Sequence, residues 1–277
     1  MLRFIVLIVL ALNIKIEAVE FVLFTQPKTG THLLIPILEE LTNKHVYWAP
    51  EFTKNGAILT DYETAAKDPC NYLFTLRKLP WTRDTMDLVW EINRTKQSFL
   101  HLHAPYSVAM EKYLEEKQCI NFFITRDPRD TVVSLLNHYK NIDFNDKEVE
   151  AISDEDERLL YMIKKESRLQ TIHFMNWLKS PVCCVLSFEK LMGAHGGAAT
   201  DYDAMKEMRK IAKALQMTIS DKDLKAVYLK HFGHGWNFFK GKAGTWKEYF
   251  NDGHKAAIKE EIGYLLIELG YEKDLEW

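Results

Sequence analysis

The chain alternates short apolar runs with longer segments in which apolar residues recur at the spacing of a helix. The runs have the length and composition of strands that are buried on both faces. They lie at residues 22–24, 97–103, 119–125 and 182–188. Helical spacing is found at residues 32–41, 107–117, 131–139, 159–178, 201–215, 220–230, 246–250 and 256–269.

Strands that alternate with helices in this way predict an α/β fold. We expect a three-layer sandwich, in which a central parallel sheet is flanked by helices on both faces. A chain of 277 residues can bury a large core, and we expect residues 19–277 to form a single domain. Ligands of such sheets bind at the carboxyl ends of the strands. The polar turns that follow the strands are therefore the expected location of a functional site.

Three segments depart from this alternation. Residues 43–60 mix aromatic and turn residues without a clear period, and residues 141–157 are acidic and polar, which is typical of a solvated loop. Residues 193–200 are rich in glycine. No strand precedes a G-x-G-x-x-G motif there, so we do not predict a dinucleotide site.

Composition narrows the class of function. The formal net charge of −3 argues against a dedicated nucleic-acid-binding protein, which would usually be basic. The four cysteines are Cys70, Cys119, Cys183 and Cys184. They form no pair at metal-ligand spacing, so the sequence predicts neither a metal site nor a disulfide framework.

Residues 1–18 allow two interpretations. Arg3 precedes an apolar run at residues 4–12, and Ala18 offers a cleavage point, as in a secretory signal. The run is shorter than the roughly 20 residues of a membrane span. We expect a signal peptide or signal anchor, which favours the secretory pathway, the periplasm or a membrane-anchored protein. The alternative is a hydrophobic start to the first strand of a cytoplasmic protein.

The turn QPKTGT at residues 26–31 carries the first indication of chemistry. A short polar turn between a strand and a helix aims backbone N–H groups at one point, which suits a phosphate. Lys28 adds a mobile charge, and Thr29 and Thr31 add hydroxyl donors. Gly30 allows a close approach of the backbone. The full nucleotide-triphosphatase loop, G-x-x-x-x-G-K-[ST], is absent.

This P-K-[ST]-G-T turn resembles the 5′-phosphosulfate loop of the sulfotransferases that use 3′-phosphoadenosine 5′-phosphosulfate (PAPS). Three later segments resemble other motifs of that family, in the same chain order. They are the 3′-phosphate motif, RDPRDTVVS at 126–134, the segment with an aromatic residue near the adenine, SFEKL at 187–191, and the loop that closes over the nucleotide, GKAGTWK at 241–247. The resemblance covers residues 19–250 and implies a P-loop-like sulfotransferase fold.

The resemblance also implies a reaction, in which a sulfuryl group moves from PAPS to a hydroxyl or amine acceptor without a metal. Lys28 would stabilise the leaving phosphate, and His103 would be the general base. His103 precedes Ala-Pro at the end of a predicted strand, which resembles the family's H-x-P, and an imidazole titrates near neutral pH. His101 is the competing candidate, since it lies two residues earlier on the same face.

The remaining site residues would bind the nucleotide. Around the 5′-phosphate the resemblance implies Thr29, Gly30, Thr31 and His32, in addition to Lys28. An Arg fork and a Ser hydroxyl would hold the 3′-phosphate, and these are Arg126 and Ser134. Phe188 would lie near the adenine. The closing loop would contribute Lys240, Gly241, Lys242 and Gly244.

Two positions depart from the family pattern. Phe239 stands where the family usually has Arg, and Leu33 stands where cytosolic members often have a Trp that stacks on adenine. An alternative is therefore a catalytically inactive protein of the same fold that binds adenosine bisphosphate. A small P-loop kinase is a further alternative, but we find no Mg²⁺-holding carboxylate after the strand at 182–188.

The acceptor is not encoded in any of these motifs. We expect a small molecule, a glycan or a lipid rather than a nucleic acid, and a membrane partner only if residues 1–18 act as an anchor. The sequence predicts no particular oligomeric state.

Overall fold

The computed structural model describes residues 19–48, 51–52, 58–59, 83, 86–87, 90–91, 94, 98–141, 149, 151–232 and 241–277. Residues 1–18, Phe239 and Lys240 lie outside the described residues, so the expectations about them stay predictions. Within the described ranges, no helix combines the length and the apolar character that a membrane span requires.

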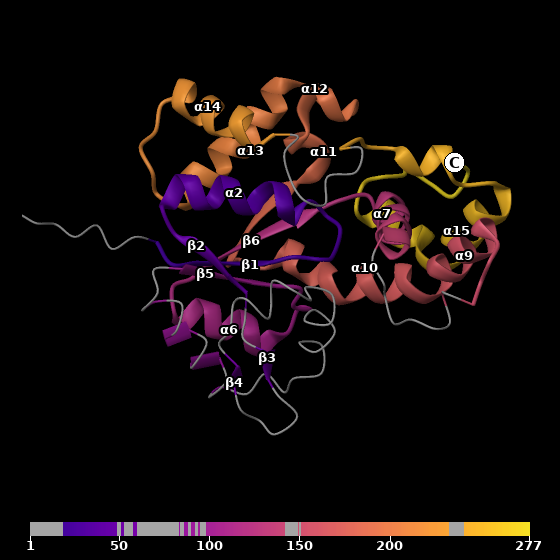
Figure 1. Ribbon diagram of the computed structural model, residues 1–277, viewed down its shortest axis with the longest axis horizontal. Helices are drawn as coiled ribbons and strands as arrows, with labels where there is room; N and C mark the ends of the chain where they lie inside the picture. The colour runs from indigo at the N-terminus through magenta and orange to yellow at the C-terminus, as the bar shows by residue number, and fades with distance from the viewer. Residues whose placement is uncertain are drawn as a thin grey trace, which may run out of the picture.

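Five parallel strands form the central sheet, in the order β2-β5-β1-β6-β7 (Figure 1). They are β1 (Phe21–Phe24), β2 (His45–Trp48), β5 (Ser98–Leu102), β6 (Ile120–Thr125) and β7 (Cys183–Ser187). Val22 of β1 is in register with Leu100 of β5 on one side and with Asn121 of β6 on the other. The carboxyl ends of these three strands therefore meet at one edge of the sheet. This arrangement confirms the predicted α/β fold.

Helices cover both faces of the sheet, because successive side chains of a strand point to opposite faces. Phe21 and Leu23 pack against one group of helices: α2 (Thr31–Thr42), α11 (Phe188–Leu191), α13 (Asp201–Ala214) and α14 (Asp221–His231). Val22 and Phe24 pack on the other face against α6 (Val108–Glu116), α10 (Arg168–Met175) and the 3₁₀ turn η2 (Asn176–Lys179). This is the three-layer sandwich that the sequence predicts.

A third apolar cluster lies beside the sheet and joins the C-terminal part of the chain to the helix that follows β6. Its elements are α7 (Pro128–Asn141), α9 (Glu155–Met162), the π turn η1 (Ile163–Ser167), the 3₁₀ turn η3 (Thr245–Glu248) and α15 (Asp252–Glu268). Figure 1 shows α7, α9 and α15 standing together at one side of the sheet. This cluster holds α7, the helix that follows β6, against the C-terminal part of the chain.

Some elements differ from the pattern-based expectation. Strand β2 forms within residues 43–60, because parallel pairing with β5 supplies the hydrogen bonds of a strand that the local pattern does not signal. A short antiparallel pair, β3 (Glu51–Phe52) and β4 (Ile58–Leu59), lies in the same stretch. The helix expected at 159–178 begins earlier, at Glu155, and is interrupted by η1. A short helix, α12 (Gly193–Gly196), opens the glycine-rich stretch.

Candidate functional site

The turn between β1 and α2 has an unusual backbone. Lys28 and Gly30 both have positive φ, at 65° and 111°. A positive φ costs a residue with a side chain roughly 1–2 kcal/mol, so Lys28 is held in a strained conformation. Thr29 is buried, and its hydroxyl closes the turn by donating to the carbonyl oxygen of Gln26 at 2.8 Å.

Gly30 is required at its position for a second reason. A Cβ built there would lie 2.6 Å from Cδ2 of Phe188 and 3.2 Å from Cδ1 of Ile124. The turn is thus packed directly against the start of α11 and the end of β6. Phe188, expected near an adenine, is buried with its ring against this turn.

Arg126 connects three segments that the sequence analysis treated separately. Its Nη1 donates to the carbonyl oxygen of Lys28 at 3.0 Å, and its Nη2 donates to the carbonyl oxygen of Lys242 at 3.5 Å. The guanidinium also stacks on Phe188, with 4.2 Å from Cζ to the ring centroid. The turn at Lys28, the end of β6 and the loop at Lys242 therefore converge at one arginine.

Arg126 is a buried cation with one donor that has no acceptor in the described part of the chain. Burial lowers the pKa of Arg126, and the carboxylates of Asp130 and Glu189 oppose this effect. Its Nε is buried, and no residue in the described part of the chain accepts a hydrogen bond from it. A buried guanidinium donor without an acceptor is unfavourable, and an anionic group bound at this edge would satisfy it.

His103 follows β5 and lies beside the turn at Lys28. Its Nδ1 lies 2.9 Å from the carbonyl oxygen of Thr25, which can only accept, so Nδ1 carries the proton in the neutral ring. Nε2 is then the nitrogen with the lone pair, as a general base requires. His103 is half-buried, whereas His101 is 1% exposed and burial holds its pKa well below 6.5. This difference favours His103 over His101 as the base.

The hydroxyl of Thr25 joins the two histidines to the turn. It lies 2.9 Å from the Thr31 hydroxyl, 3.3 Å from Nδ1 of His103 and 3.4 Å from Nε2 of His101. Thr25 belongs to none of the motifs recognised in the sequence. Its position could have indicated a site residue, because Thr25 directly follows β1 and precedes the polar turn.

Two further histidines lie near Lys28. Burial lowers the pKa of His32 and of His138 to about 4, and the Lys28 charge adds to the effect in both. Both rings are therefore neutral at pH 7. His138 is another residue that sequence reasoning missed, although it lies one helical turn after Ser134 on α7, where residues four apart share a face. Ser134 itself is half-buried in α7.

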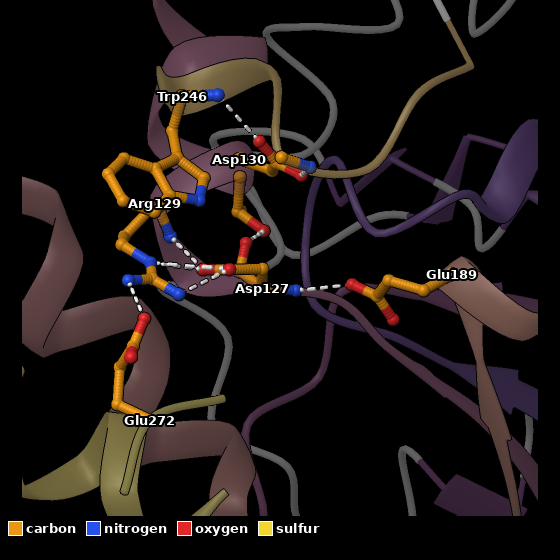
Figure 2. Close-up of polar contacts among 8 residues, drawn as sticks. Asp127, Arg129, Asp130, Glu189, Trp246 and Glu272 are labelled. Carbon is orange, nitrogen blue, oxygen red and sulfur yellow. Dashed lines mark hydrogen bonds and ion pairs between the residues drawn. The ribbon is translucent and has the colours of Figure 1, made fainter. Parts of the chain in front are cut away.

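The loop that contains Lys242 is held by the first turn of α7 (Figure 2). The Asp130 carboxylate accepts from the backbone N–H of Gly244 at 2.7 Å and from that of Trp246 at 2.8 Å. Gly241 and Gly244 have positive φ, at 61° and 72°. Burial raises the pKa of Asp130, while Arg126 and the two N–H donors oppose the rise. Asp130 lies within the motif at 126–134, but its contact with the later loop could not be inferred from the motif.

Asp127 links the same turn to α11. Its backbone N–H donates to Glu189 Oε1 at 2.7 Å, and Ser187 donates to the other carboxylate oxygen at 2.9 Å. Among the expected site residues, the structure brings Arg126 and Phe188 into contact with the turn at Lys28, and Arg126 into contact with Lys242, which is exposed at the rim. In the part of the chain that the structure describes, no three His, Cys, Asp or Glu side chains are grouped to hold a metal ion.

Comparison with known proteins gives the family and the fold. Residues 19–191 match the model of the sulfotransferase domain. No curated protein matches the chain significantly. Among solved structures, mouse sulfotransferase SULT7A1 complexed with PAP is similar, with a TM-score of 0.57, 16% identity, and coverage of 90% of this chain and 88% of that one. Retinol dehydratase in complex with androsterone and inactive cofactor PAP has a TM-score of 0.57 and 16% identity, and the match covers 89% of this chain and 80% of that one. Retinol dehydratase in a complex with retinol and PAP has a TM-score of 0.57 and 15% identity, and the match covers 92% of this chain and 83% of that one.

Proposed function

Since the chain belongs to the sulfotransferase domain family, we propose that it transfers a sulfuryl group from PAPS to a hydroxyl or amine acceptor. The observation that carries this proposal is the contact of Arg126 with both the turn at Lys28 and the loop at Lys242. A donor with phosphates at two ends needs two anion sites beside each other, and the proposal is supported by this contact between the two segments that would form them. The solved structures named above contain PAP, which is the product that PAPS would leave.

The proposed reaction is an in-line displacement at sulfur. A lone pair of the acceptor oxygen or nitrogen forms a bond to sulfur while the bond from sulfur to the bridging 5′-phosphate oxygen breaks. The acceptor proton goes to Nε2 of His103, and PAP leaves with the electron pair of the broken bond. The protein's contribution is to position the groups and to stabilise the charge that develops on the phosphate.

Lys28 would stabilise that developing charge at the bridging and phosphate oxygens. Thr29, Gly30 and Thr31 would bind the 5′-phosphate through their backbone N–H groups at the start of α2, together with the Thr31 hydroxyl. The Thr29 hydroxyl already donates to the carbonyl oxygen of Gln26 and closes the turn. His32 is neutral at pH 7 in this environment, so it would act as a hydrogen-bonding partner rather than as a charge.

The 3′-phosphate would be bound by Arg126 and by Ser134, in a site closed by Gly241, Lys242 and Gly244. Lys240 would add a second lysine to that loop. The orphan Nε of Arg126 is consistent with an anion at this position. Phe188 would then serve the site by supporting both Gly30 and Arg126, in addition to any contact with the base.

The acceptor is proposed only by class, as a small molecule, a glycan or a lipid with a hydroxyl or amine. The retinol dehydratase structures are complexes with androsterone or retinol, which supports a small molecule as one acceptor class. We propose that residues 19–277 act as a single domain in this reaction. PAPS is the co-substrate, and the reaction needs no metal.

The test is transfer of ³⁵S from labelled PAPS to a panel of phenols, alcohols, glycans and lipids. Lys28→Ala should lower transfer by about 10²–10³-fold, and His103→Ala by about 10²–10⁴-fold. Lys222→Ala and His45→Ala, both at exposed positions, are matched controls that should keep full activity. Full activity in both site variants would reject the mechanism.

An inactive PAP-binding protein is the second candidate, because of Phe239. It predicts tight binding of PAP with no turnover of any acceptor in the panel. Calorimetric titration with PAP, run beside the transfer assay, distinguishes the two functions.

A further inference from the structure

Arg129 has an unusual environment for a charged residue so close to the proposed donor site. Its side chain is 3% exposed, and its Cζ lies 4.1 Å from the ring centroid of Trp246 and 4.5 Å from that of Trp277. Its Nε and Nη2 hold the Asp127 carboxylate at 3.0 and 2.8 Å, and its Nη1 pairs with Glu272 (Figure 2). A guanidinium stays charged even when it is buried, so its position here depends on compensation of that charge by both carboxylates and by the rings.

Two of these partners come from residues 271–277, which follow α15. This segment is fixed in place by its own contacts. The Tyr271 N–H donates to the Leu266 carbonyl oxygen at 2.9 Å. A Cβ on Gly263 would lie 2.7 Å from Cδ2 of Leu275, so the segment packs closely on α15. Lys259 of α15 also lies over Trp277, 4.9 Å from its ring centroid.

Arg129 connects residues 271–277 to two segments of the proposed donor site, the turn at Arg126 and the loop at Trp246. Through Asp127 it fixes the turn that carries Arg126. Through Trp246 it fixes the loop whose backbone is bonded to Asp130. The rings of Trp246 and Trp277 are in contact as well, with centroids 5.4 Å apart. The segment 271–277 thus contacts the two structures that hold the proposed 3′-phosphate, although it lies outside every motif of the sequence.

We propose that residues 271–277 are a positioning element for the 3′-phosphate site, acting through Arg129. Glu272 and Trp277 are its positioning residues, and they touch neither substrate nor donor. The inference rests on the proposed function, because it assigns a role to the site that would bind PAP. Loss of Glu272 or Trp277 leaves the Arg129 charge poorly compensated. The turn at 126–130 and the loop at 241–246 are then no longer held in a fixed position relative to each other.

The test compares two nucleotides that differ in the 3′-phosphate alone. PAP and adenosine 5′-monophosphate are titrated calorimetrically into the full chain carrying Glu272→Gln or Trp277→Leu. We expect PAP affinity to fall by on the order of 10-fold, and the affinity for the 5′-monophosphate to stay within twofold of the unsubstituted protein. Glu276→Gln is the matched control, because it makes the same chemical change at an exposed position of the same segment.

The outcomes separate the inference from the proposed function. Equal loss for both nucleotides indicates a general structural role and overturns the inference, as does an unchanged PAP affinity. If the unsubstituted chain does not prefer PAP over the 5′-monophosphate, the proposed function fails first, and the inference fails with it. Should Glu272→Gln not fold, Trp277→Leu decides alone, since Trp277 is half-buried at the surface. Faster amide hydrogen exchange at Gly244 and Trp246 in the folded variants is the second expected result.

Discussion

Arg126 donates a hydrogen bond from Nη1 to the backbone carbonyl oxygen of Lys28, 3.0 Å away and 98 positions earlier in the chain. This single bond joins the two turns that would bind the two ends of the donor nucleotide. It also braces a lysine whose backbone has a positive φ. The same arginine that would bind one phosphate therefore shapes the turn that would bind the other.

Gly30→Ala should damage the turn between β1 and α2. The new methyl group would lie 2.6 Å from Phe188, which is a collision. The alanine backbone would also have to adopt a φ of 111°. We expect the free energy of unfolding to fall by about 2–4 kcal/mol and PAP affinity to fall with it. Chemical denaturation and calorimetric titration measure the two effects.

The control for this variant is Gly197→Ala, which has a φ of 79° and no neighbouring atom within 4 Å of the added Cβ. It should cost about 1 kcal/mol from the backbone alone. In a Phe188→Ala background, where the colliding ring is absent, Gly30→Ala should lower the free energy of unfolding by less than it does in the unsubstituted protein. Equal destabilisation by both glycine substitutions would contradict the role of the packing against Phe188.

The stability of the fold should fall as the pH is lowered from 7 to 4. Burial and Lys28 lower the pKa of His32 and His138 from 6.5 to about 4. Between those pH values the unfolded chain binds protons that the folded chain does not. The stabilisation is complete above pH 6.5 and is lost as the pH falls towards 4, by about 1–3 kcal/mol for each histidine.

Replacing one of these histidines checks this interpretation. In His138→Gln the free energy of unfolding should depend less steeply on pH between 4 and 6.5. His45→Gln changes a histidine whose side chain is 86% exposed and should leave the slope unaltered. Urea denaturation at four or five pH values gives the slopes, and identical slopes in His138→Gln and the unsubstituted protein would refute the prediction.

Asp130→Ala should loosen the loop at residues 241–246 without touching the turn at Lys28. It leaves the N–H groups of Gly244 and Trp246 without their carboxylate acceptor. We expect PAP affinity to fall roughly 10- to 100-fold. Asp130→Asn keeps one side-chain oxygen as an acceptor and should show a smaller loss. The order Asp, Asn, Ala in decreasing affinity is the result to look for.

Thr25→Val should slow transfer while leaving PAP binding nearly intact. The backbone carbonyl would still hold Nδ1 of His103, but the hydroxyl contact with the ring and with Thr31 would be lost. We expect turnover to fall roughly 10-fold, and Thr25→Ser to restore most of it. Long-range ¹⁵N–¹H spectra of the imidazole should still report a proton on Nδ1 in Thr25→Val. A shift of that proton to Nε2 would show that the hydroxyl, rather than the carbonyl, selects the tautomer.

Several residues of the candidate site could not be found from sequence because their partners are distant in the chain. Asp130 and Arg129 stand in a recognisable motif, but their roles depend on Trp246, Glu272 and Trp277, which lie more than a hundred residues later. His138 shares a helix face with Ser134, yet only the tertiary structure brings it within the influence of the Lys28 charge. Strand β2 was missed for the same reason, since its identity comes from pairing with β5.

Local chemistry alone determined the core strands β1, β5, β6 and β7, the helices between them and the turn at Lys28, because short-range patterns of apolar, glycine and proline residues dictate these elements. From those came the expected α/β sandwich and the resemblance to sulfotransferases. Tertiary structure alone decided that Arg126 would reach the Lys28 carbonyl and that residues 271–277 would close around Arg129. Such contacts depend on the relative placement of elements, which is set by the packing of the whole core and is not written in any one stretch of the chain.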